Sequence, residues 1–384
     1  MKTKATRKSK PYKVAFVTEI LTHYRIPFHE QVRQKLLERN VSYEVYYSDP
    51  TGDAALKFEK TDLQWGKKIK SVRIGNKAIW QPIKEALNAD LIIVGQENKL
   101  IATYYAIIWG KIARKKIAFF GHGKNFQSKH SASHREKWKK FWATKVFWWF
   151  GYTDETRIHL ETLGFPEKKI TIFQNSIDTS KITEELGLIS QQQHMEMREN
   201  LLDNSDNVGI YVGGIYKEKR ISFLLEAALY IREALPNFQL IVIGSGPDEN
   251  MIGDRNANWI HFVGPKYAMQ KTELISQAKV WLMPGLVGLA VVDSFAYGIP
   301  MVTCDLDYHS PEFAYLRNME NGIILPEQTT PKEYADAIAD LLQNKDLLSQ
   351  LSTGAKMSKT KYTIEAMSDR FVEGVIMALK AKIN

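Results

Sequence analysis

Cysteine is nearly absent from this chain, and its apolar runs are short. The single cysteine among 384 residues, Cys304, excludes an internal disulfide and fits a reducing compartment. Residues 279–303 form the most apolar stretch, but Pro284, Gly285 and Asp293 interrupt it, which leaves less than the ~20 residues that a membrane span needs. The basic N-terminus leads into a strand without the apolar core of a signal peptide, so we expect a cytoplasmic protein.

Clusters of metal ligands are also missing from the sequence. No group of histidine, cysteine and glutamate has the spacing of a zinc site. Asp305 and Asp307 form a D-x-D pair, but they follow a predicted strand, where local hydrogen bonding to the backbone explains aspartate. We therefore expect no metal and no resident cofactor.

An excess of positive charge points to anionic partners. The chain holds 52 Lys and Arg against 43 Asp and Glu, a formal net charge of +9. Nucleotide phosphates, an anionic membrane surface or nucleic acid would fit this charge. Because no nucleic-acid-binding module is recognisable, we expect no nucleic acid among the partners.

Apolar strands and helical segments alternate along the chain, beginning with a strand at 14–18 and a helix near 27–39. Repeated strand-then-helix order predicts an α/β fold with two Rossmann-like, doubly wound parallel-sheet domains facing a central cleft. The predicted boundaries are 11–178 for the N-terminal Rossmann-like domain, 179–206 for a linker, 207–362 for the C-terminal Rossmann-like domain, and 363–384 for a helix that crosses back to the N-terminal domain.

The stretch 279–303 is the most informative part of the chain. It predicts a strand at Val280–Met283, a glycine-rich turn, and a short helix at Leu289–Tyr297. A strand, a glycine turn and a helix N-terminus form an anion site in a parallel sheet. Backbone N–H groups around Gly288 and Leu289 would then face a phosphate.

Three charged residues extend this predicted phosphate site. Lys219 and Arg220 stand at the predicted start of a helix, where a cation opposes the helix dipole unless an anion is bound. They would neutralise the charge that develops on a departing pyrophosphate. Asp293 would accept hydrogen bonds from both ribose hydroxyls, and a structural hydrogen bond to a neighbouring loop is the alternative.

The N-terminal half offers three candidate site residues. His122 lies between two glycines directly after a predicted strand, and carboxyl ends of strands line the ligand crevice in open α/β sheets. The alternative to a functional role is that His122 is an ordinary loop histidine with satisfied hydrogen bonds. Tyr24 and Arg25 follow the first strand and would hold an acceptor, although a helix-capping loop explains them equally well.

Five motifs stand in order along the chain: YTDETRIHLETLGFPEKKITIFQNSID, YVGGIYKEKRISFLLEAA, LIVIGSGPDENM, WIHFVG and KVWLMPGLVGLAVVDSFAYGIPMVT. Together they resemble the retaining nucleotide-sugar glycosyltransferases of the two-Rossmann B fold, specifically the large family four. The resemblance covers about residues 150–330, and the N-terminal half matches only in pattern. It implies a metal-independent hexosyltransferase that moves a sugar from a nucleoside diphosphate sugar, its co-substrate, to a glycan or lipid-linked acceptor with retention of configuration.

The resemblance also implies roles for particular residues. His122, Lys219 and Glu312 would be catalytic, with Glu312 and the acceptor-binding His309 both in the segment DYHSPEFAYL, while Tyr24 and Arg25 complete the acceptor set. The donor-binding residues would be Gly213, Gly214, Lys219, Arg220, Gly244, Val263, Gly288, Leu289 and Asp293.

Two positions depart from the family pattern. The first glutamate of the family's carboxylate pair falls on Gly285, and the second falls on Asp293, which is shorter by one methylene. The arginine of the phosphate motif falls on Gly214, while Lys219 and Arg220 carry the positive charge. These departures leave two alternatives open, an epimerase of the same fold and a degenerate, non-catalytic sugar-nucleotide-binding module.

Two segments, 100–116 and 134–149, combine basic with aromatic residues. Such segments suit an interfacial helix on an anionic leaflet, and an ordinary helix with a cationic outer face explains them as well. A peripheral position on the inner face of the cell membrane is therefore an expectation. It would place Arg114, Lys115, Lys139 and Lys140 against the leaflet and insert Trp109, Trp138 or Trp142.

Overall fold

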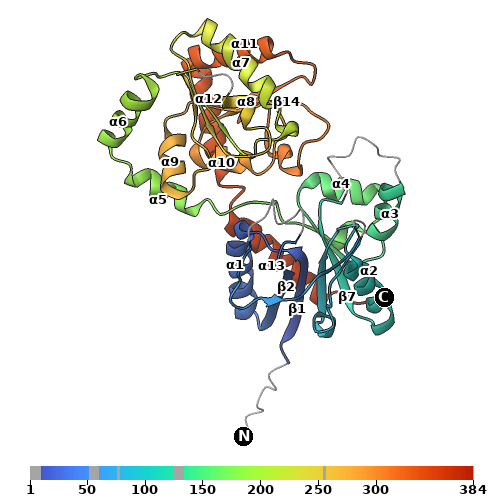
Figure 1. The fold of residues 1–384 in the computed structure, drawn as a ribbon. Coiled ribbons are helices and arrows are strands. Elements are labelled where there is room, and N and C mark those ends of the chain that lie inside the picture. Colours follow the sequence, from blue (N-terminus) through green and yellow to red (C-terminus); the bar gives the residue numbers. More distant parts are fainter. Residues whose placement is uncertain (1–9, 52–59, 76–77, 124–133, 254–256, 384) are drawn as a thin grey trace. The chain divides into compact units, whose positions relative to one another are not determined.

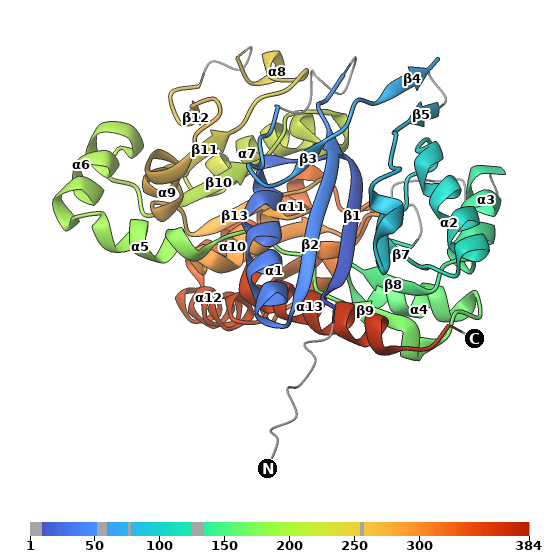
Figure 2. The ribbon, with the colours of Figure 1, turned by 90° about the horizontal axis from the view of Figure 1, so that it is seen from below.

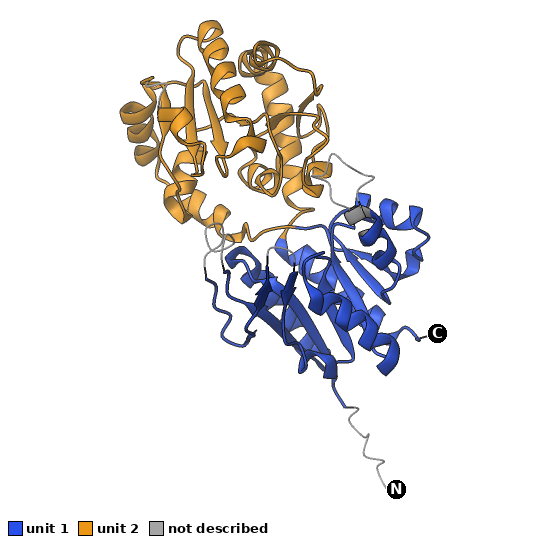
Figure 3. Cartoon of the chain, turned by 45° about the vertical axis from the view of Figure 1, so that its right-hand side comes forward, with its two compact units in different colours: residues 1–125, 130–175, 364–384 blue, residues 126–129, 176–363 orange. Residues whose placement is uncertain are grey.

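The computed structural model describes residues 10–51, 60–75, 78–123, 134–253 and 257–383. The chain divides into two compact units (Figure 3), and each is built on its own parallel sheet. The prediction of two doubly wound parallel-sheet domains is therefore confirmed. Residues 1–125, 130–175 and 364–384 make the N-terminal unit, and residues 126–129 and 176–363 make the C-terminal unit.

A seven-stranded sheet with the strand order β3-β2-β1-β6-β7-β8-β9 forms the centre of the N-terminal unit. Figure 1 labels its strands β1, β2 and β7. The chain therefore starts in the middle of the sheet and adds strands to both sides, as doubly wound folds do. Its strands are β1 (Tyr12–Ile20), β2 (Val41–Ser48), β3 (Lys67–Lys68), β6 (Leu91–Gly95), β7 (Lys116–Gly121), β8 (Trp148–Gly151) and β9 (Ile170–Ile172), and β4 (Val72–Ile74) pairs with β5 (Ala78–Trp80) in a separate antiparallel ribbon.

Helices cover both faces of this sheet because its strands are apolar on both sides. On β1, Val14 and Phe16 pack into one core with α1 and α13, whereas Ala15 and Val17 pack into the other core with α2. Figure 2 shows α1 and α13 side by side, away from α2 and α3. The helices are η1 (His23–Arg25), α1 (Ile26–Glu38), η3 (Ala86–Asn88), α2 (Ile101–Ala113), α3 (His134–Ala143), α4 (Asp154–Thr162), η4 (Glu167–Lys169) and α13 (Ile364–Lys380).

The C-terminal helix α13 is part of the N-terminal unit's core. Its Phe371 is fully buried, and its ring centroid lies 4.6 Å from that of Phe150 and 5.1 Å from that of Phe28. Phe16, Phe120 and Phe173 surround the same ring at centroid distances of 6.1–6.4 Å. The last segment of the chain is thus needed to complete the hydrophobic core of the first unit.

The C-terminal unit has a six-stranded sheet in the order β12-β11-β10-β13-β14-β15, all parallel. The strand order reverses between β10 and β13, and in such sheets ligands bind beyond the carboxyl ends of the strands at this switch point. The strands are β10 (Val208–Val212), β11 (Gln239–Ile243), β12 (Ile260–Phe262), β13 (Val280–Met283), β14 (Met301–Cys304) and β15 (Gly322–Leu325). The helices are α5 (Ser180–Leu188), α6 (Gln191–Leu202), η5 (Lys217–Lys219), α7 (Ile221–Ala234), α8 (Asn250–Gly253), α9 (Ala268–Ser276), α10 (Ala290–Tyr297), η6 (Pro311–Tyr315), α11 (Pro331–Gln343) and α12 (Lys345–Lys359).

Two local features differ from the sequence prediction. Residues 179–206, predicted as a linker, form α5 and α6 inside the C-terminal unit, and α6 begins with a capping box between Ser190 and Gln193. Lys219 and Arg220 precede α7 rather than open it, since Lys219 ends η5 and Arg220 adopts a left-handed conformation with φ of 55°. Across the described residues, no helix is long and apolar enough to cross a membrane.

Phe371→Ala should destabilise the N-terminal unit by about 3–5 kcal/mol, because it removes the ring that five other aromatic side chains surround. Met377→Ala on the exposed side of the same helix is the control and should change stability by no more than about 0.5 kcal/mol. Chemical denaturation followed by tryptophan fluorescence measures both. Equal stability of the two variants would contradict a core role for α13.

Candidate active site

Two loops at the carboxyl edge of the C-terminal sheet, one after β10 and one after β11, are bonded to each other through their backbones. Gly213 donates to the Ile243 carbonyl at 3.0 Å, and Ile215 donates to that of Ser245 at 2.9 Å. A Cβ on Gly244 would lie 1.9 Å from the Gly213 oxygen, so only glycine fits there. The predicted donor residues Gly213, Gly214 and Gly244 therefore lie in one rigid platform, where Gly244 is required for loop packing.

The loop after β13 is fastened to the turn that carries Lys219. The Leu286 N–H donates to the Glu218 carbonyl at 2.9 Å, and the Lys219 ammonium donates to the Leu286 carbonyl at 2.6 Å. A Cβ on Gly285 would lie 2.4 Å from the Lys219 carbonyl carbon. The position of the first family carboxylate is thus filled by the backbone of residues 218–219, which explains in physical terms why a glycine stands there.

Lys219 is buried, with 6% of its surface exposed. Burial lowers its pKa to about 8, because the ammonium loses its hydration with a single carbonyl in return. An anion beside this group would raise the pKa again. The geometry therefore holds a lysine whose protonation state responds to a nearby negative charge.

Arg220 lies beside Lys219 and is held by residues at the ends of β13 and β14. Its guanidinium donates to the Pro284 carbonyl at 3.3 Å, hydrogen-bonds the Cys304 thiol, and stacks 4.0 Å from the Phe223 ring centroid. Two cations thus meet at the switch point between β10 and β13, as expected for an anion site in this fold.

The start of α10 brings a further charged pair to this edge. Gly288 precedes Leu289, the residue before the helix, and Asp293 lies in the first turn. The Asp293 carboxylate accepts a hydrogen bond from the Lys271 ammonium at 2.7 Å, and both side chains are largely buried. Sequence analysis missed Lys271, which comes from α9 and belongs to no motif. The pair places the Asp293 carboxylate and the Lys271 ammonium together where a ribose was predicted.

His309 is a buried connector between two loops. Val287 donates its N–H to Nδ1 at 2.9 Å, and Nε2 donates to the Cys304 carbonyl at 2.7 Å, which assigns the Nε2–H tautomer. Burial lowers the pKa of His309 to about 4, so the ring is neutral near pH 7. Both ring nitrogens of His309 are thus occupied by hydrogen bonds to the backbone. This arrangement fits a role in positioning the loop after β13 better than the predicted contact with an acceptor.

The two remaining predicted residues of this unit lie on either side of the platform. Glu312 is buried in the first turn of η6, at 3% exposure. Val263 follows β12 and donates its N–H to the Val242 carbonyl at 3.1 Å. Val263, one of the predicted donor-binding residues, is therefore fixed by the sheet at the carboxyl end of β12.

The candidate residues of the N-terminal unit meet at the carboxyl edge of its own sheet. His122 follows β7, and its ring centroid lies 4.2 Å from that of Tyr152, the residue after β8. Arg25 donates to the Tyr152 hydroxyl at 3.4 Å and stacks against its ring and that of Tyr24. Tyr152 thus contacts both His122 and Arg25, and Arg25 contacts Tyr24. The sequence did not predict Tyr152 as a site residue.

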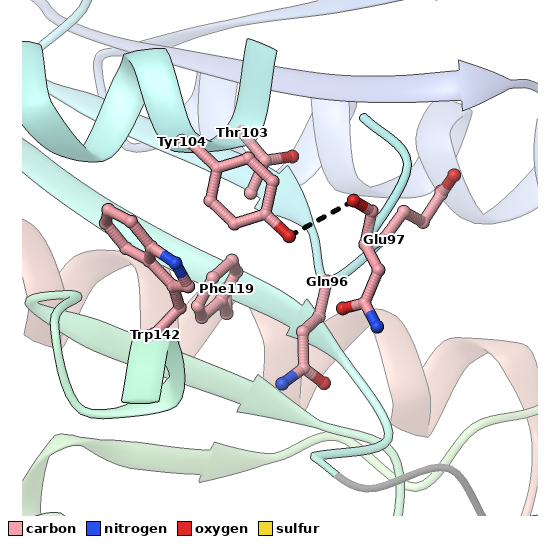
Figure 4. Close-up of a pocket in the computed structure, with 7 residues that line it drawn as sticks. Gln96, Glu97, Thr103, Tyr104, Phe119 and Trp142 are labelled. Atoms are coloured by element: carbon pink, nitrogen blue, oxygen red, sulfur yellow. Dashed lines mark hydrogen bonds between the residues drawn. The ribbon is translucent and has the colours of Figure 1, made fainter. Parts of the chain in front are cut away.

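A small pocket opens beside this cluster at the end of β6 (Figure 4). Its volume of about 10 Å³ holds one water at most, so it is too small for a sugar. Gln96 links it to the His122 loop by donating to the Gly123 carbonyl at 3.2 Å. The lining residues are Gln96, Glu97, Asn98, Thr103, Tyr104, Phe119 and Trp142.

Acidic and histidine side chains do not gather into a metal site within the described ranges. Asp305 and Asp307, the D-x-D pair, follow β14 in a turn, and Asp305 donates its N–H to the Leu325 carbonyl at 2.8 Å. This backbone bond continues the pairing of β14 with β15, and the turn interpretation of the two aspartates stays a prediction.

Comparison with known proteins shows which family and which solved structures the chain resembles. Residues 192–358 match the family of Glycosyl transferases group 1. The whole chain is similar to the crystal structure of Anabaena HepE in complex with UDP-glucose, with a TM-score of 0.67, 14% identity, and coverage of 95% of this chain and 99% of that one. The chain therefore has the B fold, and residues 192–358 resemble a group 1 glycosyl transferase domain.

Two curated relatives each resemble slightly less than half of the chain. An alpha-monoglucosyldiacylglycerol synthase from Acholeplasma laidlawii is 26% identical over 185 residues, which is 46% of this chain and 45% of the relative. An alpha-D-kanosaminyltransferase from Streptomyces kanamyceticus is 24% identical over 190 residues, 47% of this chain and 48% of the relative. The match thus spans about half the length of the curated relatives.

Gly285→Ala should lower the stability of the C-terminal unit by about 1–3 kcal/mol, since the added methyl group would overlap the backbone of residues 218–219. Gly187→Ala is a matched control in α5, where nothing lies within 4 Å of the new Cβ, and it should be neutral or stabilising. Thermal unfolding compares the two variants. A Gly285→Ala protein as stable as the wild type would contradict the packing explanation for this glycine.

Proposed function

We propose that this protein is a retaining, metal-independent hexosyltransferase that moves a sugar from a nucleoside diphosphate sugar to a glycan or lipid-linked acceptor. One observation carries the proposal. Lys219, Arg220, the start of α10 and the Asp293–Lys271 pair converge at the switch point of a sheet in a group 1 glycosyl transferase domain. The HepE complex with UDP-glucose supports a nucleotide-sugar donor on this fold.

The donor diphosphate would bind against Lys219 and Arg220, with backbone N–H groups of Gly288 and Leu289 on its other side. Cleavage of the anomeric bond leaves negative charge on the departing diphosphate, and preorganised donors in a water-poor site stabilise such charge strongly. The bound anion would also return Lys219 to its charged form, because an opposite charge favours the ammonium. Gly213 and Gly214 would let the diphosphate approach the backbone.

Asp293 would hold the ribose of the nucleotide. Its carboxylate lies in the first turn of α10 and already accepts one hydrogen bond from Lys271. A carboxylate has room for further donors, so two ribose hydroxyls can bind without displacing that lysine. Val263 at the end of β12 would contact the base, and the buried Glu312 would act near the reacting sugar.

The N-terminal unit would supply the acceptor site. His122, Tyr24, Arg25 and Tyr152 form one connected group at its carboxyl edge. Aromatic faces and a guanidinium are suited to the apolar face and the hydroxyls of a sugar. The reaction requires this group to meet the donor sugar during turnover. The proposal gives His122 a direct contact with the sugar.

The proposed acceptor rests on the name of one relative, and the proposed location rests on the net charge of the chain. The relative from Acholeplasma laidlawii is named as a synthase of a diacylglycerol glycoside, which supports a lipid-linked acceptor. The formal net charge of +9 suits a peripheral position on the anionic, cytoplasmic face of a membrane.

A binding module without transferase activity is the second candidate. The observation that favours it is Gly285, where backbone fills the position of the first family carboxylate. The transferase, the epimerase and the binding module differ in a direct assay. A transferase releases free nucleotide faster when acceptor is present, an epimerase converts the donor without releasing nucleotide, and a binding module does neither.

Lys219→Ala should lower kcat on the order of a hundredfold, comparable to the loss of one oxyanion donor. The wild-type kcat/KM should fall as pH rises through about 8, since the free enzyme loses the Lys219 proton there, and Lys219→Arg should remove this fall. Lys217→Ala is the control, because this exposed lysine lies on the same turn. Nucleotide release from a nucleotide sugar measures both effects. Equal turnover of the two alanine variants would refute the role of Lys219.

A further inference from the structure

A pocket of about 300 Å³ lies at the amino ends of β7 and β8 in the N-terminal unit. Lys115 in its lining immediately precedes β7, and Lys145 lies three residues before β8. Because these strands are parallel, the pocket lies at the edge of the sheet opposite to the one that carries His122 and Tyr152. Its lining shares none of the described residues with the candidate active site, so a ligand here would not compete with substrates at the other edge.

Four cationic side chains line this pocket, namely those of Lys111, Arg114, Lys115 and Lys145. Among the described residues, no carboxylate belongs to the lining, and none of the four cations forms an ion pair. Like charges gathered around one cavity repel one another, so a bound anion would stabilise the arrangement.

Two of these cations are held in place by neutral groups. Lys115 donates to the Asn88 carbonyl at 3.3 Å, and the Lys145 ammonium lies 5.0 Å from the Phe141 ring centroid. The C-terminal end of α2 also favours cations at this place, but a helix end carries only about half an elementary charge, against four cations. The pocket therefore keeps an excess of positive charge that a bound anion would balance.

The rest of the lining is apolar, apart from Gly110, where a Cβ would lie 2.3 Å from Cγ1 of Ile117. Ile117 and Val146 are buried, Phe147 is partly buried, and Ile383 is 44% exposed. Sites for small molecules usually have volumes of about 300–1,000 Å³ and combine apolar walls with a few polar groups. The pocket therefore matches a molecule with an anionic head and an apolar body better than it matches a bare ion.

We propose that this pocket binds a soluble organic phosphate, that is, a phosphate monoester with an apolar body. A phosphate monoester carries a charge of about −1.5 to −2 at pH 7 and three acceptor oxygens, so it can engage several of the four cations, whereas a carboxylate offers one charge and two oxygens. The guanidinium of Arg114 can bind such a group through two parallel hydrogen bonds. The apolar body would lie against Ile117, Val146 and Phe147. This site would exist whether or not the protein transfers a sugar.

The pocket does not lie on the face of α2 that the sequence placed against a membrane. Trp109 is exposed on the side of the helix opposite to the pocket, as its spacing from the lining residues shows. Trp142 is partly buried and packs against Tyr104 at a ring-centroid distance of 5.1 Å, so it is not available for the predicted insertion. The Lys139 side chain lies outside the described residues. A leaflet in contact with Trp109 would lie away from the pocket, which favours a ligand from solution.

Calorimetric titration of the full chain with phenyl phosphate tests the proposal, in the presence of saturating UDP so that the proposed donor site is occupied. Phenyl phosphate should bind at least about tenfold more tightly than inorganic phosphate, which lacks the apolar body, or phenol, which lacks the charge. Lys111→Gln with Lys145→Gln should weaken its binding roughly tenfold or more, as expected for the loss of charge-assisted hydrogen bonds. Lys84→Gln with Lys99→Gln removes the same charge from exposed positions outside the pocket and should change little. Ile383→Ser should weaken the binding of phenyl phosphate but not that of inorganic phosphate.

Three outcomes would overturn the proposal. The first is the absence of phenyl phosphate binding to the wild type. The second is an equal loss in the pocket pair and the control pair, which would reduce the effect to net charge. The third is sedimentation with phosphatidylglycerol vesicles that the pocket pair abolishes, without binding of phenyl phosphate, which would make the ligand a lipid headgroup. Titration with UDP alone reports the donor site, so failure of the proposed function stays distinguishable from failure of this pocket.

Discussion

The carboxyl edge of the C-terminal sheet depends on one contact, the junction between the turn at residues 217–219 and the loop after β13. Two hydrogen bonds make it, from the Leu286 N–H to the Glu218 carbonyl and from the Lys219 ammonium to the Leu286 carbonyl. The junction crosses the switch point between β10 and β13, where ligands bind in this fold. It fixes the buried lysine, leaves room only for glycine at position 285, and sets where α10 begins.

The same junction explains how this domain can depart from the family pattern that it resembles and still keep the proposed anion site. A carboxylate at position 285 would need space that the backbone of residues 218–219 occupies. Positive charge is concentrated instead on Lys219 and Arg220, which hydrogen-bond to backbone carbonyls of the β13 loop. The proposed donor site is therefore built from cations, backbone amides and one carboxylate, Asp293, which accepts a hydrogen bond from Lys271.

Much of this could be predicted from the sequence, because local patterns determine it. Hydrophobic runs and glycine turns predicted the strand at Val280–Met283 and the helix up to Tyr297, and both are confirmed. Long-range packing was not predictable. Lys271 and Tyr152 enter their sites only because the fold brings distant segments together, and the engagement of both His309 nitrogens depends on two loops from different strands. Residues 179–206, predicted as a linker, form α5 and α6, because a polar sequence with a capping box still forms helix.

Hydrogen–deuterium exchange on the intact chain, with and without UDP, tests the central claim most directly. Amides gain protection where a ligand orders or covers the backbone. The account predicts protection at residues 213–220, 244–249 and 284–293 of the C-terminal unit. It predicts little change at residues 110–117 and 145–147 of the N-terminal unit. Unchanged exchange at 284–293, or protection confined to the N-terminal unit, would contradict a nucleotide site at the junction of the β10 and β13 loops.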